Sequence, residues 1–553
     1  MAQLQHFWPL CNAALLGVPP ILYLLGGVGG QLASARKRSV AHAWRLAHFT
    51  STVALFFSLV CCADALLQAA SLTRRPQIDT LTRFGAVHLS FRFDLIESLM
   101  LVLVAFLGWV IVRYSRAYMA GDPKEPSYVG HLMRTLAAVS LLVVTNNLIV
   151  FLAAWVLTSL SLHGLLTLYP NRQAAVIAAH KKFLASRLGD LTLLCGVVLL
   201  GSQAGSFEMD AVVYHVAGLK SVPGSIHVAA CLLAISAIIK CAQLPLHGWL
   251  IQVMEAPTPV SALLHAGVVN LGGFMLIRLA PVIDSTHLAQ SLLVVVGCLT
   301  ATISSLVMTT RISIKVHLAW STCAQMGFML MECGLGLYDL AFLHLLSHSL
   351  YKAYAFLGSG GAVNQSKLKR MAPAGPKMSF TVLVAGGLFG VFVSTLAALV
   401  WRPGASVDAA LILCIPIVGF AIAGILASVL SARSLAAAVV LAIAAIGVSL
   451  LYFGYDTLFQ KVVPGGTIHL AQQRPVLFFA VGCFVVLYAI QTTVRVNPLG
   501  QFATTLYPWF YAGLYLDEVF TRATFHLWPA NKISRVSPRR DVTQPFETAG
   551  GTL

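Results

Sequence analysis

The sequence predicts an all-α polytopic membrane protein with about 15 (14–16) transmembrane helices. Of its 553 residues, 58% are hydrophobic and 10% are charged. Soluble domains average about 25% charged residues. Windows of about 20 apolar residues also recur along most of the chain, and each is long enough to cross a bilayer. Together these observations exclude an ordinary soluble domain.

The predicted spans are the windows near 10–30, 47–70, 96–114, 131–145, 148–169, 186–203, 228–253, 258–281, 289–310, 316–336, 339–361, 379–401, 409–431, 434–454 and 475–494. No basic segment precedes the first window, so we predict that it is retained and not cleaved as a signal peptide. The segment 71–93 is predicted to be an external loop. The 11 cysteines lie mostly inside apolar windows and form no CxxC motif, which indicates small buried side chains and no disulfide or metal framework.

The charge balance is basic, with 36 Lys and Arg residues against 19 Asp and Glu residues and a formal net charge of +17. The basic residues lie between apolar windows, where they act as topology signals, so a lipid bilayer and no nucleic acid is expected as partner. The positive-inside rule places the N-terminus outside, and it places the segment 31–46 and the loops at 118–130 and 170–185 in the cytoplasm. The tail after about residue 497 is then cytoplasmic too.

An ionisable side chain inside a span is a functional candidate because burying a charge in the bilayer is costly. Lys240 follows an apolar run and is followed by Pro245, while Pro257 and Pro259 stand at the start of the next span. Proline removes a helix hydrogen bond, so these residues predict broken helices with open carbonyls that hold an ion or water. A desolvated lysine at such a break can exchange a proton near neutral pH. The alternative is a lysine neutralised by a carboxylate, with a structural role.

A second candidate is the stripe formed by His344, His348 and Lys352. A spacing of four places the three side chains on one helix face, with a rise of about 6 Å between neighbours. Such a stripe can relay protons through intervening water. Two alternatives stay open, namely satisfied core histidines and a metal-binding pair. The metal-binding alternative lacks an adjacent third ligand, so no metal site is predicted in this chain.

The third candidate is Asp190, which enters a span after the basic segment 181–187. It is the nearest carboxylate in the sequence that can pair with Lys240. A capping or loop role for Asp190 is equally open. Asp94 and Glu97, at the start of the third span, are predicted to be structural.

Taken together, these segments resemble the antiporter-like, proton-translocating subunits of respiratory complex I and of multi-subunit cation/proton antiporters. The resemblance covers about residues 80–370 and is most specific in KCAQLPLHGWL and APTPVSALLHAG. It is supported by RLGD, RISIKVHLAWSTCAQMGFML and HLLSHSLYKAYAFLGSG.

The resemblance implies two inverted repeats with broken helices and a chain of polar residues that carries protons along the membrane midplane. The implied division is 1–130 for N-terminal transmembrane helices, 131–280 for the first repeat, 281–455 for the second repeat, 456–500 for a C-terminal transmembrane helix, and 501–553 for a cytoplasmic amphipathic segment and tail. By position, the implied ion-pathway residues are the central lysine Lys240, the aspartate Asp190, the connecting histidine His265, the onward link of His344, His348 and Lys352, and Lys315 after the ninth span.

Two departures from the family pattern narrow the resemblance. Val156 stands where the family has a glutamate that partners the central lysine, and 379–400 contains none of the charged residues expected on the second broken helix. This pattern is similar to the membrane subunits of Dab-type inorganic-carbon accumulation complexes of bacteria. Those subunits pair with a large soluble, zinc-containing, carbonic-anhydrase-like subunit. The resemblance therefore implies a multi-pass location in the bacterial inner (plasma) membrane, with no cofactor in this chain and zinc in the partner.

The function expected from these observations is conduction of H⁺ or Na⁺ to drive accumulation of CO₂ or bicarbonate by the partner, with no enzymatic chemistry in this chain. One alternative is a cation-translocating subunit of a complex I-like, hydrogenase or multi-subunit antiporter complex. A second alternative is an anchor for a cytoplasmic enzyme. The segment from Tyr511 to Arg540 is the predicted partner-binding surface. The choice between H⁺ and Na⁺ stays open at this stage.

Overall fold

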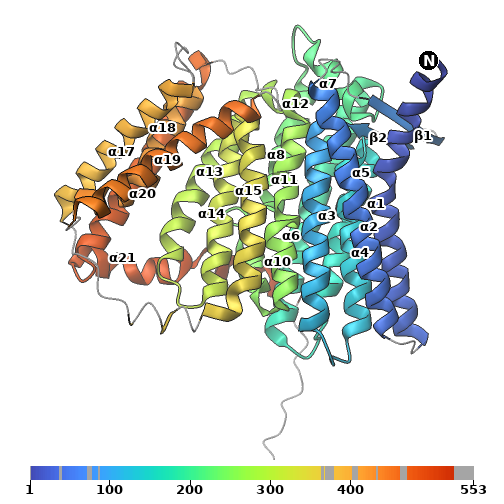
Figure 1. The fold of residues 1–553 in the computed structure, drawn as a ribbon, viewed down its shortest axis with the longest axis horizontal. Helices are drawn as coiled ribbons and strands as arrows, with labels where there is room; N and C mark the ends of the chain where they lie inside the picture. Colours follow the sequence, from blue (N-terminus) through green and yellow to red (C-terminus); the bar gives the residue numbers. More distant parts are fainter. Residues whose placement is uncertain are drawn as a thin grey trace, which may run out of the picture.

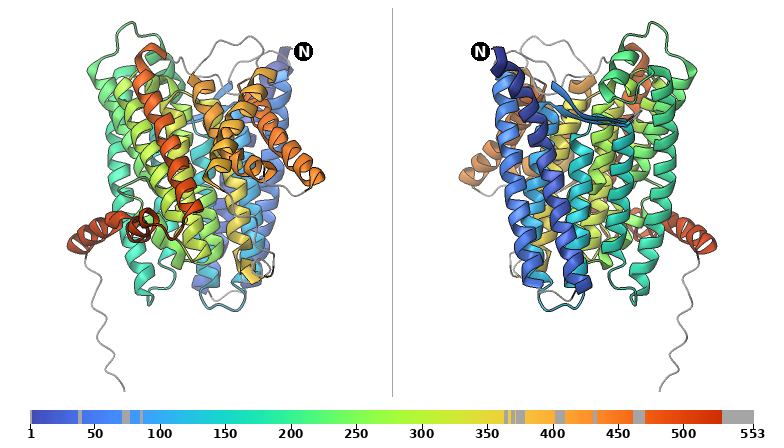
Figure 2. Two further views of the ribbon diagram at one scale, coloured as in Figure 1. Left: turned by 90° about the vertical axis from the view of Figure 1, so that its left-hand side faces the viewer. Right: turned by 90° about the vertical axis from the view of Figure 1, so that its right-hand side faces the viewer.

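The helices stand side by side as an upright bundle, with a short segment lying across one end of it (Figures 1 and 2). This is a computed structural model, and it describes residues 2–36, 40–70, 77–84, 87–362, 366–367, 371, 379–401, 409–430, 434–460 and 470–528. The predicted division of the chain into two repeats stays a prediction. Residues 529–540 of the predicted partner-binding segment lie outside the described residues.

The first part of the chain forms the side of the bundle that carries the N-terminus (Figure 1). Its helices are α1 (Ala2–Arg36), α2 (Val40–Ala70), α3 (Leu95–Tyr118), α4 (Glu125–Val144), α5 (Leu148–Leu166) and α6 (Gln173–Ala204). Glycines bring α1 and α4 into close contact, because a Cβ atom at Gly30 would lie 2.6 Å from the backbone nitrogen of Gly130. Such contacts between small residues are the usual way in which apolar helices associate in lipid.

A β-hairpin interrupts the helices between α2 and α3. Strands β1 (Gln77–Phe84) and β2 (Val87–Phe93) are antiparallel, so the prediction of a loop over 71–93 is wrong for these residues. The signal was present, since polar and apolar residues alternate through Val87–Phe93 as in a half-buried strand. The hairpin is tied to the bundle by a hydrogen bond from the backbone N–H of Asn146 to the carbonyl of Ser90, at 2.8 Å.

The central part of the chain contains the interrupted helices. Its elements are α7 (Met209–Ala217), α8 (Gly224–Lys240), α9 (Gly248–Gln252), η1 (Val253–Glu255), α10 (Thr258–Ala266), η2 (Val268–Asn270), α11 (Leu271–Arg278), α12 (Ala280–Asp284), α13 (His287–Met308), α14 (Ile314–Gly334), α15 (Tyr338–Leu357) and η3 (Gly358–Gly361). Figure 1 shows α13, α14 and α15 standing next to α8 and α11.

The last part forms a tilted group at the far side of the bundle (Figure 1). Its elements are α17 (Phe380–Trp401), α18 (Ala409–Leu430), α19 (Leu435–Phe459), α20 (Leu470–Val496), α21 (Gln501–Tyr511), η4 (Gly513–Tyr515) and α22 (Leu516–Leu527). Helix α17 is continuous, and a Cβ atom at Gly390 would lie 2.2 Å from the carbonyl oxygen of Gly419 on α18. The second half therefore has a tightly packed apolar helix at the place where the family resemblance implies a broken, charged one.

The number of membrane spans agrees with the prediction of about fifteen. Within the described residues, twelve helices are long and apolar enough to cross a membrane. Three further helices stand among them: α8, a shorter apolar helix of 17 residues, and α14 and α15, of 21 and 20 residues, which carry more polar side chains. The chain is a multi-pass, helical membrane protein.

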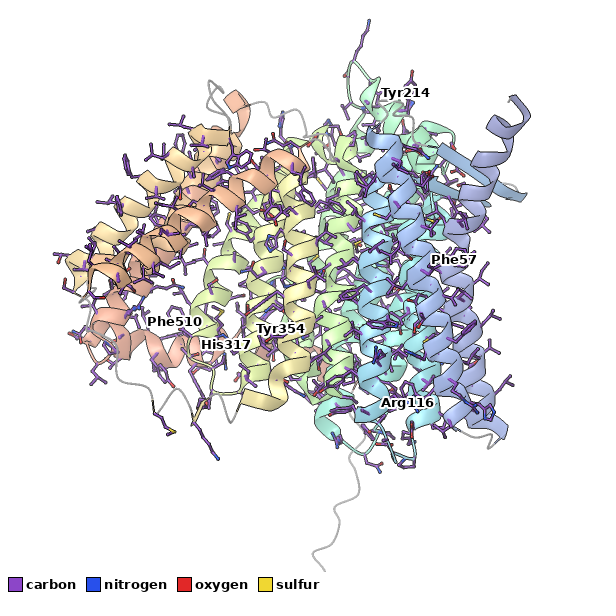
Figure 3. All side chains as sticks on the ribbon, in the orientation of Figure 1. Phe57, Arg116, Tyr214, His317, Tyr354 and Phe510 are labelled. Atoms are coloured by element: carbon purple, nitrogen blue, oxygen red, sulfur yellow. The ribbon has the colours of Figure 1, made fainter. Side chains whose placement is uncertain are left out.

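The two ends of the bundle can be assigned by charge. Figure 3 shows Arg116, His317 and Tyr354 toward the end where α21 and α22 lie, and Tyr214 at the opposite end. Arg113 and Arg116 in the last turns of α3, and Lys124 just before α4, lie toward this end, so the positive-inside rule makes it the cytoplasmic end. We call the Tyr214 end the outer end. Figure 2 shows the red C-terminal segment, α21 and α22, running crosswise to the upright helices toward their cytoplasmic ends and projecting beyond one side of the bundle.

A buried ion pair joins the first and central parts of the bundle. The Glu97 carboxylate on α3 lies 3.1 Å from Arg278 Nε on α11, and both side chains are 1% exposed. Arg278 also donates to the carbonyl of Thr145 at 2.7 Å, and Arg92 lies 3.7 Å from the same carboxylate. Glu97, expected to be structural, lies in the interior and holds three elements together.

Removing the Glu97 charge is expected to destabilise the protein strongly, because Arg278 would stay buried without its partner. We expect Glu97→Ala to lower the free energy of unfolding by about 3–5 kcal/mol. The measurement is thermal unfolding in detergent, with Glu518→Ala as the control because the Glu518 side chain is 59% exposed. Equal unfolding temperatures for the two variants would contradict a structural role for this pair.

Candidate functional site

Lys240 lies at the interruption between α8 and α9. Helix α8 ends at this residue, α9 begins at Gly248, and Pro245 lies between them. Ala242 has a φ of 51°, a left-handed conformation that is uncommon for a residue other than glycine. The Lys240 residue is only 7% exposed. The chain thus places an ammonium group in the interior of the bundle, at a helix end.

The surroundings of Lys240 show what replaces the glutamate that the family has at position 156. The Lys240 ammonium lies 4.3 Å from the centre of the Trp155 ring, whereas Val156 is half-buried. Asp190 on α6 is close enough to act electrostatically on Lys240, but it is ion-paired with Arg187 at 2.6 Å. Within the described residues, no carboxylate forms an ion pair with Lys240. An aromatic face and a shared aspartate take the place of a dedicated acid.

A second buried lysine, Lys182, lies beside this site and was missed in the sequence. Its ammonium donates to the carbonyl and the hydroxyl of Ser159 at 2.5 and 2.8 Å. Lys182 and Lys240 line one cavity of about 10 Å³ together with Trp155, and this is about the room that one water molecule needs. Lys182 precedes Asp190 by eight residues on α6, so the two share a helix face, and that spacing is a signal that could have revealed it.

The Trp155 ring is expected to stabilise the charged form of Lys240. A desolvated cation–π contact contributes about 2 kcal/mol. We therefore expect Trp155→Leu to lower ion-coupled transport about tenfold, while Trp155→Phe keeps most of it because a ring face remains. The measurement is transport at equal expression for both variants. Wild-type transport in Trp155→Leu would show that the ring does not contribute.

The backbone groups freed at the break are partly satisfied by the protein itself. Gln243 Nε2 donates to the carbonyl of Cys241 at 2.7 Å, and the N–H of Leu244 donates to the Thr300 hydroxyl at 3.2 Å. The Cys241 carbonyl is therefore occupied by a side chain, and the binding of an ion or water by the other carbonyls at the break stays a prediction. Lys240 lines the cavity next to the break, together with Lys182 and Trp155.

The next span is also interrupted, at a position the sequence did not reveal. Pro257 and Pro259 lie at the start of α10, where proline fits a helix. The interruption itself falls at Gly267, between α10 and α11, and Asn270 donates there to the carbonyl of Ala266 at 3.1 Å and to the Ser349 hydroxyl at 2.7 Å. A polar side chain thus satisfies the freed backbone, as is usual for broken helices in membranes.

His265 lies one turn before this interruption and is fully buried. Its Nδ1 is 3.1 Å from the Thr322 hydroxyl on α14, and its ring stacks on Phe356 of α15 with centroids 4.4 Å apart. Its Nε2 has no hydrogen-bond partner among the described residues. His265 is close enough to Lys352 and His348 for their charges to interact.

The α15 stripe lies inside the bundle as a row. Lys352 is fully buried and donates to the carbonyl of Leu318 at 2.9 Å. His348, 5% exposed, has no hydrogen-bond partner for either ring nitrogen among the described residues. The rings of His348 and His344 are 6.1 Å apart. Because α15 runs from the outer end toward the cytoplasm, the row leads outward from Lys352 to His344.

The row continues to a residue missing from the predicted site. Glu332 on α14 is 2% exposed, and its Oε2 lies 3.1 Å from His344 Nδ1. On the far side of Glu332 lies Asp456 of α19, which is 3% exposed and close enough to interact with it electrostatically. The signal in the sequence was a single carboxylate within the apolar window 316–336.

Two predicted connections are not seen. Among the described residues, no hydrogen bond, ion pair or ring contact joins Lys240 to His265, although Val268 beside His265 lines the Lys240 cavity. Lys315 is half-buried at the start of α14 and makes no hydrogen bond or ion pair with the other described residues. In the part of the chain that the structure describes, no three His, Cys, Asp or Glu side chains come together to hold a metal ion.

The comparisons with known proteins agree with this geometry. The family model for the transmembrane region of NADH:quinone oxidoreductase and Mrp antiporters matches residues 145–402, and that for the N-terminus of complex I chain 5 matches 82–129. The chain is 36% identical over 535 residues to the probable inorganic carbon transporter subunit DabB of Hydrogenovibrio crunogenus, covering 96% of this chain and 97% of that protein. The chain belongs to the DabB family.

Other relatives of this DabB-family chain are matched over less of their length. The probable inorganic carbon transporter subunit DabB2 of Halothiobacillus neapolitanus is 37% identical, over 84% of this chain and 85% of that protein. NAD(P)H-quinone oxidoreductase chain 5 of a Synechocystis strain is 32% identical over 55% of this chain and 45% of that protein.

The solved structures show that the fold is shared with chains of two membrane complexes. A chain of the Mrp complex from Dietzia aligns with a TM-score of 0.55 at 20% identity, over 93% of this chain and 61% of that chain. A chain of an archaeal membrane-bound sulfane sulfur reductase aligns with a TM-score of 0.58 at 15% identity, over 91% of this chain and 99% of that chain. The predicted antiporter-like membrane fold is thereby confirmed.

The C-terminal segment docks directly below the Lys240 break. Asp517, near the start of α22, accepts a hydrogen bond from Lys181 Nζ at 2.8 Å and one from Gln252 Nε2 of α9 at 2.9 Å. Lys181 is fully buried, and Trp528 stacks on His180 with centroids 4.0 Å apart. The same surface segment therefore contacts both α6, which carries Asp190, and α9, which follows the break.

Proposed function

We propose that this chain is the membrane subunit of an energy-coupled inorganic-carbon accumulation complex. It conducts H⁺, or Na⁺, down its gradient and so drives CO₂ hydration or bicarbonate accumulation by a partner. The proposal is supported by the end-to-end similarity to a protein named as an inorganic carbon transporter subunit. The observation that carries the conducting role is the buried lysine Lys240 at a helix break, with a row of buried titratable side chains beside it.

The chain's own residues divide the work as follows. Lys240 takes up and releases a proton. Trp155 and Asp190, whose carboxylate is shared with Arg187, hold the Lys240 side chain in place. His344 and His348 carry the charge inward along α15, and Lys352 and His265 pass it across the interrupted helix α10–α11 toward Lys240. A water molecule in the cavity next to Lys240 is needed for the transfer, because no direct contact joins Lys240 to His265.

The chemistry on inorganic carbon belongs to a partner in this proposal. We expect a large, soluble, zinc-containing, carbonic-anhydrase-like subunit that binds at the cytoplasmic end, where α21 and α22 lie across the bundle. This chain itself then acts as a transporter subunit and not as an enzyme. The docked α22, bonded through Asp517 to α6 and α9, offers a direct mechanical link between that partner and the Lys240 break.

Purification of the tagged chain from its native membranes in mild detergent tests this proposal. We expect a large zinc-containing soluble protein to co-purify, as measured by mass spectrometry and a zinc assay. Recovery with quinone-reductase, hydrogenase or small antiporter subunits would instead support the alternative of a respiratory or antiporter module. The anchor alternative predicts the same zinc partner but normal carbon uptake when Lys240 is removed.

A further inference from the structure

The proposed row of proton carriers needs an opening to one side of the membrane, and α17 offers no charged residue for it. Within Phe380–Trp401 no Asp, Glu, Lys, Arg or His is present. The buried groups at the outer end of the row are Glu332 and His344. The family resemblance implies a role for His344 but not for Glu332. This inference rests on the proposed function and adds a terminal site to it.

We propose that Glu332, together with His344, is a second proton-binding site that connects the row to the outer side. Glu332 lies two residues before the end of α14, which runs from the cytoplasmic to the outer end. Its contact with His344 Nδ1 at 3.1 Å is buried, with side-chain exposures of 3% and 11%. A proton held between a carboxylate and an imidazole can pass to either group with little movement.

An unsatisfied histidine on the inner side gives this site a receiver. His348 lies one turn inward of His344, with ring centroids 6.1 Å apart, and neither of its ring nitrogens has a partner among the described residues. Burying an imidazole without a hydrogen bond costs free energy. This cost is offset if a water molecule bonds to His348, or if His348 accepts a proton from His344. The Phe328 ring packs on His344 with ring centroids 5.3 Å apart.

Groups on α19 give the site a route outward. Asp456 lies in the last turn of α19 and faces Glu332, as does Tyr452 one turn before it. The Tyr452 hydroxyl donates to Cys414 Sγ on α18 at 3.5 Å. Since α19 reaches the outer end at Phe459, a proton from the outer side meets Asp456 first and Glu332 next. The other groups close enough to interact with Glu332 are His344 and the thiols of Cys333 and Cys414.

The test is proton entry into proteoliposomes that hold the purified complex, measured with an internal pH indicator after an acid step outside. We expect Glu332→Gln to lower the initial rate about tenfold or more, and Glu332→Asp to restore part of it because the carboxylate returns. The matched control is Asp284→Asn, since Asp284 is an outer-end carboxylate that accepts hydrogen bonds from Tyr338 and Gln290. Co-purification of the partner checks that each variant is assembled.

The outcomes separate this inference from the proposed function. If Glu332→Gln takes up protons at the wild-type rate while Lys240→Ala takes up none, the inference of a second proton-binding site is wrong and the proposed function stands. Wild-type rates in both variants would overturn the proposed function as well. If Glu332→Gln fails to assemble, His344→Gln takes its place with the same expected loss, and a wild-type rate in that variant also overturns the inference.

Discussion

Replacing Lys240 with alanine is expected to lower uptake of labelled bicarbonate into cells by about 100-fold, because a positioned proton carrier contributes about 10²–10⁴-fold to a transfer step. The lysine is buried at a helix end and lines a cavity that has room for one water molecule. Without its ammonium, the protons have no carrier at the break between α8 and α9. The measurement is uptake in cells that express this chain with its partner.

Two matched variants make this prediction specific. Lys220→Ala removes an exposed lysine between α7 and α8 and should keep full uptake. Lys240→Arg keeps the charge, but a guanidinium does not release its proton in a protein, so this variant should be as inactive as the alanine variant. Full uptake in Lys240→Arg would mean that Lys240 acts as a fixed charge and not as a proton carrier.

Reversing the charge of Asp517 is expected to have the second largest effect. Asp517→Lys would set a second ammonium against the buried Lys181, at a place where the present contact is 2.8 Å. Loss of a hydrogen-bonded, partly buried charge pair costs about 2–5 kcal/mol, so α22 should detach from α6 and α9. We expect bicarbonate uptake to fall about tenfold while the chain remains in the membrane. Protease cleavage of the C-terminal segment should rise at the same time.

The neighbouring residue offers the control for this variant. Glu518→Lys makes the same charge change one residue later, but Glu518 is exposed, and its only ion pair among the described residues is with Arg522, at 3.6 Å. It should keep both uptake and protease resistance. If Asp517→Lys transports normally while its C-terminal segment is cleaved freely, α22 does not link the partner to the Lys240 break.

The sequence was most informative where a charged or polar residue stands within an apolar run, because few physical explanations fit such a residue. Lys240 within an apolar run, and the spacing of four that joins His344, His348 and Lys352, predict buried polar side chains because a charge in lipid requires a partner or a function. The structure places these groups inside the bundle as a row. The number of spans followed from window length alone, since the bilayer fixes how many apolar residues a helix needs.

The parts that the sequence did not reveal depend on contacts between distant segments. Glu332 faces His344 from another helix, and Asp517 meets Lys181 across 336 positions of the chain. The break at Gly267 carries no proline, so no local pattern marks it. The hairpin at Val87–Phe93 was missed for a different reason, because search windows of helix length pass over a short alternating strand.

The most direct test of the account is cation entry into proteoliposomes that hold the purified complex, with either an H⁺ or a Na⁺ gradient imposed. We predict that the wild-type complex dissipates one of the two gradients and that Lys240→Ala dissipates neither. The gradient that the wild type dissipates should also drive bicarbonate accumulation. Equal dissipation by wild type and Lys240→Ala, or bicarbonate accumulation that needs neither gradient, would contradict the claim that this chain conducts the driving ion through Lys240.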